Sequence, residues 1–140
     1  MDTSPKPKKT LMTIVEQIVS RQIDAAIVYE SKHVIAFADH DPINFGHILI
    51  CPKVAYENLV DLPDSIAAEI HTVAKDLYRR IEKAFQPDGI SFIQNNGSFN
   101  ELSHYHLHIF PRFKGDKFGW VSSGLGVQSI EVLREHLAYL

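Results

Sequence analysis

Three histidines near the end of the chain alternate with apolar residues, and this pattern restricts the fold more than any other feature. They are His104, His106 and His108, within Ser103-His-Tyr-His-Leu-His-Ile-Phe110. Because a strand directs alternate side chains to one face, the spacing predicts a strand over 103–110 that presents all three imidazoles together. The Cα atoms of successive histidines then lie about 6.6 Å apart along the strand, so neighbouring rings can meet one substrate group, and the intervening apolar residues pack against the other face.

A shared histidine face indicates chemistry more than structure. An imidazole has an unperturbed pKa of about 6.5, so it acts as a nucleophile, an acid or a hydrogen-bond donor near neutral pH. Burying three such rings costs desolvation free energy that a purely structural strand avoids with Val or Thr. The same spacing suits a metal ion, for which Asp39, Glu101 and His47 are candidate further ligands. Spacing alone does not separate metal binding from metal-free catalysis.

The composition predicts one domain over residues 1–140, with 1–9 as a flexible tail. A hydrophobic content of 45% in 140 residues is enough for one core. The net charge of -3 argues against polymeric nucleic acid as the partner. The single cysteine, Cys51, excludes an intrachain disulfide and a zinc site built from several thiolates, and it favours a cytoplasmic location. No apolar run approaches the roughly 20 residues of a membrane span.

The order of periodic segments predicts an α+β fold: a mostly antiparallel sheet of about five strands, one long helix, and shorter N- and C-terminal helices. Apolar residues three and four apart indicate the helices, whereas short apolar runs between turn residues indicate the strands. Pro111 is expected to stop the last strand. The helices are predicted at 10–21, 63–85 and 127–140, and the strands at 26–29, 34–37, 47–51, 91–94 and 103–110.

The segment His104-Tyr-His-Leu-His-Ile-Phe110 resembles the signature of the histidine triad (HIT) superfamily. The stretch from Val34 to Lys53, which contains Asp39, Pro42 and Gly46-His47, is similar to the central pattern of that family. Asn95-Asn96-Gly97 and Pro111-Arg112 also stand where the family has them. The resemblance implies a HIT-like homodimer that acts on a nucleotide, with a purine nucleotide favoured, at the α-phosphorus and without a cofactor or catalytic metal.

The resemblance also implies a role for each site residue. His106 attacks phosphorus and forms a covalent nucleotidyl-histidine, which water then cleaves. His108 donates a hydrogen bond and supplies a proton, His104 orients His106, and His47 braces the cluster from a neighbouring strand. The candidate nucleotide-binding residues are Phe37, Asp39, His40, Asn95 and Asn100.

Two departures from the family pattern stand out. Many members bind a structural zinc through Cys-x-x-Cys and Pro-Lys-x-His; here Thr13 and Glu16 take the cysteine places and Ala55 follows Pro52-Lys53-Val54, so we predict no zinc site. The segment before the triad, 98–103, replaces the usual Ala-Gly-Gln. Asn100 is a candidate for the glutamine's role, whereas Glu101 brings a negative charge toward the phosphate unless it faces away or pairs.

The first hypothesis is a hydrolase of nucleoside phosphoramidates, nucleotidyl adducts or dinucleoside polyphosphates. A second is a nucleotide-binding or interaction module whose catalysis is weak or vestigial, suggested by the altered loop at 98–103. A third is a metal-binding β protein that uses the three alternating histidines. The segment 113–124, with two lysines and Trp120, is either a lip for the leaving group that reaches a partner subunit or an exposed connection.

Overall fold

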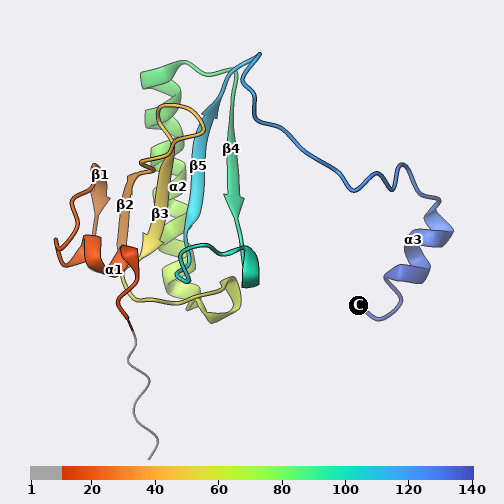
Figure 1. Ribbon diagram of the computed structural model, residues 1–140, viewed down its shortest axis with the longest axis horizontal. Helices are drawn as coiled ribbons and strands as arrows, with labels where there is room; N and C mark the ends of the chain where they lie inside the picture. The colour runs from red at the N-terminus through yellow and green to blue at the C-terminus, as the bar shows by residue number, and fades with distance from the viewer. Residues whose placement is uncertain (1–10) are drawn as a thin grey trace, which may run out of the picture.

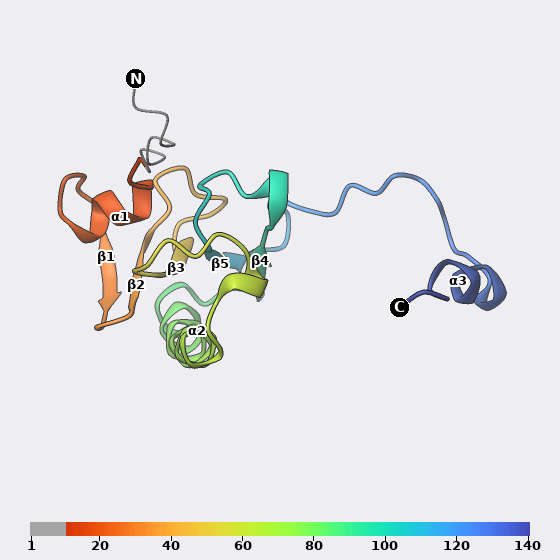
Figure 2. The same ribbon diagram turned by 90° about the horizontal axis from the view of Figure 1, so that it is seen from below.

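The computed structural model describes residues 11–140 and contains one five-stranded antiparallel sheet with the strand order β1-β2-β3-β5-β4. This confirms the α+β prediction. Helices α1 and α2 lie on opposite faces of the sheet, as the end-on view makes plain (Figure 2). The helices are α1 (Ile14–Val19), α2 (Asp64–Phe85) and α3 (Ile130–His136), and the strands are β1 (Ile27–Glu30), β2 (Val34–Ala38), β3 (Ile48–Pro52), β4 (Gly89–Gln94) and β5 (Leu107–Arg112).

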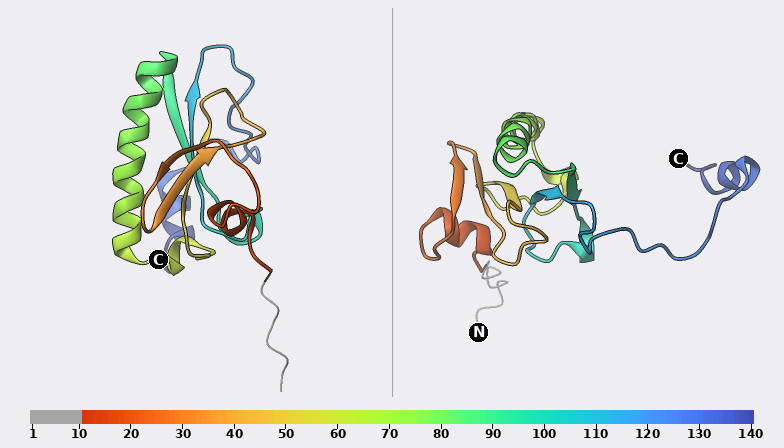
Figure 3. Two further views of the ribbon diagram at one scale, coloured as in Figure 1. Left: turned by 90° about the vertical axis from the view of Figure 1, so that its left-hand side faces the viewer. Right: turned by 90° about the horizontal axis from the view of Figure 1, so that it is seen from above.

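The long helix α2 packs on one face of the sheet, over the central strands β2, β3 and β5 (Figures 1 and 3). Its predicted apolar stripe is buried, and Gln86 ends it in the left-handed conformation. The stripe packs on alternate residues of the central strands, as expected for a strand whose neighbouring side chains face opposite ways. The buried residues of this layer include Ile70, Val73, Leu77 and Ile81 of α2, Ala36 of β2, and Ile48 and Ile50 of β3.

The short helix α1 covers part of the other face. Val15 and Ile18 are buried against residues of β2 and β3 in a second, smaller apolar cluster. The helix begins with a capping box, in which the Thr13 hydroxyl accepts from the Glu16 amide and the Glu16 carboxylate accepts from the Thr13 amide. This face is only partly covered, and the functional pocket lies in the uncovered part.

Several predicted boundaries were wrong. The last strand begins at Leu107, not at residue 103, because Ser103 has a positive φ of 51° that interrupts extended backbone. It also continues through Pro111, which pairs with Ile90 of β4. A proline is tolerated there because the pairing of β3 with β5 runs from Leu107 to Ile109 and ends before Pro111, so no partner on that side requires an N–H from residue 111. The two short 3-10 helices, at 59–61 and 97–99, were not predicted.

Beyond β5 the chain leaves the body as an extended arm that carries α3 (Figures 1 and 2). No residue of α3 is buried, and Trp120 and Val127 are fully exposed. The predicted C-terminal helix is therefore present but shorter, at 130–136. The predicted tail at 1–9 and the predicted helix start at Thr10 lie outside the described residues. Among residues 11–140, no helix is both long and apolar enough to cross a membrane.

Candidate active site

The triad histidines face the side of the sheet opposite α2. His108 pairs with Leu49 of β3, which belongs to the α1-side cluster, whereas Tyr105 and Ile109 pack with α2. The alternation therefore holds although β5 starts only at Leu107. Both His104 and His106 are buried, with 0% and 4% of their surface exposed.

One nitrogen of His106 is committed to a hydrogen bond and the other is free. Its Nδ1 lies 2.8 Å from the carbonyl oxygen of His104. A carbonyl only accepts, so Nδ1 carries a proton, and in the neutral form of the ring the lone pair lies on Nε2. Among the described residues Nε2 has no hydrogen-bond partner, and His106 lines the pocket. The arrangement leaves a nucleophilic nitrogen available at the protein surface.

His104 is fixed from both sides and does not line the pocket. Its Nε2 donates to the carbonyl oxygen of Pro52 at 2.7 Å, so its Nδ1 must accept, and it lies 2.8 Å from the Thr13 hydroxyl. The N-cap residue of α1 thus contacts the first triad histidine. Since the His104 carbonyl in turn accepts from His106, α1 is linked to His106 through two hydrogen bonds.

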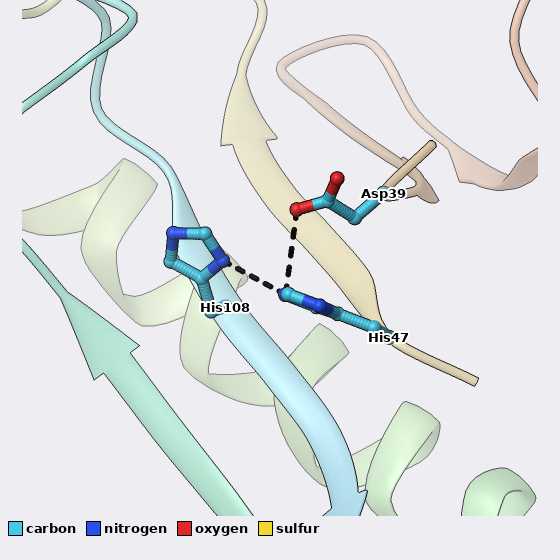
Figure 4. Close-up of side chains that lie close together, drawn as sticks. All are labelled: Asp39, His47 and His108. Carbon is cyan, nitrogen blue, oxygen red and sulfur yellow. Dashed lines mark hydrogen bonds and ion pairs between the residues drawn. The ribbon is translucent and has the colours of Figure 1, made fainter. Parts of the chain in front are cut away.

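His47 and His108 form a hydrogen-bonded pair of rings, shown with Asp39 in Figure 4. The backbone amide of Ile43 donates to His47 Nδ1 at 3.1 Å, so the proton of His47 sits on Nε2. That Nε2 is 2.9 Å from His108 Nδ1, which therefore accepts. The remaining nitrogen of His108, Nε2, must carry a proton. The site thus offers one lone pair, from His106, and one N–H donor, from His108.

Burial keeps these rings neutral. Desolvation, together with the neighbouring His106 and His47, lowers the pKa of His108 to about 4 against the opposing effect of Asp39. Desolvation also lowers the pKa of His47, although Asp39 and Asp41 oppose the shift. The pKa of His104 is lowered by the same cause. At neutral pH these three imidazoles carry no charge, as the hydrogen-bond pattern requires.

Asp39, His47 and His108 offer ligand atoms within 4.8 Å of one another, a grouping that a metal ion might be expected to use. The hydrogen bonds oppose that use. The His47 Nε2 that faces the other two side chains carries a proton, because Nδ1 is committed to the Ile43 amide. A metal ligand needs a lone pair there. Asp39 lies 3.6 Å from the same Nε2 and accepts from the Asp41 amide, which suits a carboxylate that orients a neutral imidazole.

The residues at the zinc positions of similar proteins do not fit zinc in this chain. Thr13 is a poor zinc ligand, and its hydroxyl is occupied by the Glu16 amide and His104. One carboxylate oxygen of Glu16 accepts a hydrogen bond from the Thr13 amide in the cap of α1. Ala55 has no ligand atom. In this chain the first triad histidine is therefore supported by a hydrogen bond from Thr13.

A cavity of about 720 Å³ opens beside His106 and His108. It brings together most of the predicted nucleotide-binding set, since Phe37, Asp39 and His40 all line it. Asn95 and Asn100 do not line it. The Asn100 side chain is buried, where it donates to the Glu57 carbonyl and accepts from the Leu102 amide. Glu101, the neighbouring residue, is the one that faces the cavity.

Sequence reasoning missed two parts of this site. The apolar end of the cavity is made by α1 and the segment after it, through Ile14, Ile18 and Ile23. The available signal was the set of apolar residues on this short amphipathic helix. One of them, Ile14, keeps 45% of its surface exposed in the structure. The second omission is the Ile43 amide, which no sequence signal identifies, since any non-proline residue supplies the same donor.

The comparisons agree with this geometry. The HIT domain model matches residues 20–115. An uncharacterized HIT-like protein of Methanocaldococcus jannaschii is 39% identical over 132 residues, covering 89% of this chain and 98% of that protein. The crystal structure of a HIT family member from Bacillus subtilis superposes with a TM-score of 0.79 at 34% identity, covering 90% of this chain and 92% of that one.

Two relatives carry names that state an activity. The adenosine 5'-monophosphoramidase of Saccharomyces cerevisiae is 33% identical, over 75% of this chain and 65% of that protein. The adenylylsulfatase of Arabidopsis thaliana is 31% identical, over 77% of this chain and 55% of that protein. The family model covers more than half of the chain, and the fold matches that of the solved relatives. The chain therefore belongs to the HIT family.

Proposed function

We propose that this protein is a HIT-type nucleotide hydrolase that acts at the α-phosphorus through a covalent nucleotidyl-histidine. The names of the two relatives support a nucleotide phosphoramidase or a related hydrolase. The single observation that carries the proposal is the state of His106: its Nδ1–H is bonded to the His104 carbonyl, so its lone pair lies on the nitrogen that has no partner.

The proposed reaction has two displacements. In the first, His106 Nε2 forms a bond to phosphorus as the bond to the leaving group breaks, and the leaving group takes the electron pair and the proton of His108 Nε2–H. In the second, water attacks the phosphorus and gives a proton back to His108, the bond to Nε2 breaks, and a nucleoside monophosphate is released. His108 Nε2–H is a fixed donor for a phosphoryl or leaving-group atom, and its orientation is already set by His47.

The nucleoside is proposed to lie in the apolar end of the cavity. Phe37, Ile18 and Leu49 supply apolar surface there for a base, and Asp39 supplies a carboxylate for the ribose hydroxyls. Asn95 and Asn100, which were assigned to the phosphate or ribose by resemblance, lie away from the cavity wall. We assign Asn100 to holding the loop before the triad, because both ends of its amide are bonded to backbone.

The homodimer implied by the resemblance remains part of the proposal. Strand β4 lies at the edge of the sheet, and its Phe92 is 42% exposed. Phe92, Tyr78 and Leu107 line an apolar groove between this edge and α2. A free sheet edge beside an apolar groove suits pairing with a second copy. A cytoplasmic location also stays a prediction.

The test replaces His106 by Asn and measures hydrolysis of an adenosine phosphoramidate, with single-turnover labelling to trap the adenylylated protein. We expect the rate to fall by at least about 10³-fold, because Asn has no imidazole nitrogen with which to form the bond to phosphorus. Unchanged turnover would contradict the proposal. Tight AMP binding by the natural protein without turnover would favour the nucleotide-binding module instead. His33→Asn, at an exposed position, is the matched control.

A further inference from the structure

The wall of the cavity carries four carboxylates, and no lysine or arginine of residues 11–140 lines it. The acidic residues are Asp24, Asp39, Asp41 and Glu101. The basic side chains closest along the chain are already paired: Arg21 and Lys53 with Glu30, and Arg112 with Asp116. For a site that binds a phosphate derivative this is an unusual charge balance, because phosphate sites usually supply a guanidinium or ammonium group.

The histidines do not offset this negative charge. His47 and His108 have lowered pKa values, so neither ring brings a positive charge, and the His108 Nε2–H is the N–H donor of this pair that is left for phosphate. A single phosphodiester or phosphoramidate charge is tolerated by such donors. Each additional negative charge on the substrate meets the carboxylates without compensation.

Of the four carboxylates, Glu101 lies nearest to His106 along the chain, on the segment that leads into the triad and five residues before that histidine. Asp39 accepts from the Asp41 amide and faces His47, and Asp24 accepts from the Ala25 amide. The Glu101 carboxylate makes no hydrogen bond or ion pair with any other side chain or amide in the described part of the chain. The side chain of the neighbouring residue, Asn100, is bonded to backbone. Of these two residues, only Glu101 therefore has a side chain that is left to contact the substrate.

We propose that Glu101 selects the leaving group by charge, favouring an amine that carries a positive group over a leaving group that carries further negative charge, such as a nucleotide phosphate. The inference rests on the proposed function and narrows its substrate class from nucleotide derivatives in general to conjugates with cationic or neutral amines. Dinucleoside polyphosphates are then poor substrates.

The experiment uses three adenosine 5'-phosphoramidates of matched size, whose amine ends in an ammonium, a methyl or a carboxylate group. The measured quantity is the ratio of kcat/KM for the cationic and the anionic conjugate. In Glu101→Gln we expect this ratio to fall at least about threefold, and in Glu101→Lys to fall further. One charge pair about 8 Å apart at a protein surface supplies an effect of this order. Because each ratio is compared between variants, the intrinsic reactivity of the three amines cancels.

Asp76→Asn is the matched control, since it removes one negative charge from α2, on the opposite face of the sheet. We expect it to leave the ratio unchanged. The ratio in the natural protein is also expected to decrease as the salt concentration rises. A ratio that is the same in the natural protein and in both Glu101 variants would overturn the inference, as would an equal change in Asp76→Asn.

Failure of the proposed function gives a different result. If no conjugate is hydrolysed by the natural protein, calorimetric dissociation constants for the same three conjugates replace kcat/KM. A charge-dependent affinity that Glu101→Gln weakens supports the role of Glu101 even without turnover. Equal affinities for all three conjugates overturn it. Thermal unfolding of each variant confirms that the comparison is made between folded proteins.

Discussion

At the scale of single residues, the site is defined by which ring nitrogens hold protons. Each assignment follows from a partner that has only one role: the carbonyls of Pro52 and His104 accept, and the Ile43 amide donates. The sequence predicted that the three triad histidines are unequal, but it assigned their roles by resemblance. The hydrogen bonds supply a physical reason for the difference, because among the three triad histidines only His106 presents a nitrogen without a hydrogen to the cavity.

Thr13 is the residue whose replacement tests this reasoning most directly. Thr13→Val keeps the shape of the side chain but leaves the buried Nδ1 of His104 without a donor and removes the cap of α1. We expect the free energy of unfolding to fall by about 1–3 kcal/mol and kcat to fall with little change in KM. Urea unfolding and steady-state kinetics measure the two effects.

Two further substitutions separate the contributions of Thr13. Thr13→Ser retains the hydroxyl and is expected to restore both values. Ser129→Ala removes only a helix cap, at α3, and is expected to leave kcat near that of the natural protein. A fully active Thr13→Val protein would show that the contact with His104 does not position His106.

At the scale of elements, the turn before β3 sets the position of His47. Gly46 has a φ of 99°, and an added Cβ would lie 2.8 Å from Cε2 of Phe85 at the end of α2. The turn also brings the His47 amide to the Asn44 carbonyl. Gly46 thus serves both the backbone conformation and the close approach of α2.

Gly46→Ala is expected to lower the free energy of unfolding by about 1–3 kcal/mol from backbone strain, with a further loss from the contact with Phe85. Its activity is expected to fall because His47 moves relative to His108. In the double variant Gly46→Ala/Phe85→Leu, the contact is relieved and only the backbone cost remains. Denaturant unfolding of the single and double variants gives the two parts. Equal losses in both variants would mean that the Phe85 contact costs nothing.

The comparison of prediction and structure is also clearest for elements. The helix over 63–85 was predicted to within one residue because five apolar residues at helical spacing all face one buried surface. The start of β5 was misplaced because the alternation of His and apolar residues continues through 104–106, where the left-handed Ser103 has already turned the chain. Neither the pairing of Pro111 nor the turning inward of Asn100 is visible in sequence, since both depend on neighbours far along the chain.

At the scale of the whole molecule, the buried histidines make stability depend on pH. The pKa of His108 is about 4 in the folded protein and near 6.5 in an unfolded chain. Between these values the unfolded state binds more protons, so stability falls as the pH falls through this range. From pH 7 to pH 5 we expect a loss of about 1–2 kcal/mol for His108 alone, with His47 and His104 adding in the same direction.

Denaturant unfolding at several pH values measures this slope. His108→Gln removes the titrating ring and is expected to flatten the curve, whereas His71→Gln, at an exposed position of α2, is expected to leave it unchanged. The ion pair with Arg112 lowers the pKa of Asp116, so its stabilisation is fully present between pH 7 and pH 5 and is lost only at more acidic pH, outside this range. A stability that does not change between pH 7 and pH 5 would contradict the neutral state assigned to the cluster.

The exposed apolar residues of the C-terminal arm affect how the protein responds to its own concentration. Beyond residue 119 nearly every apolar side chain of the arm is in water, among them Trp120, Val121, Val127 and Leu140. Covering such surface contributes about 25 cal/mol per Å², and the arm of a single copy lies away from its own sheet (Figure 1). If a second copy supplies the cover, dilution removes it, and rate constants determined at nanomolar and micromolar protein then describe two different molecular species.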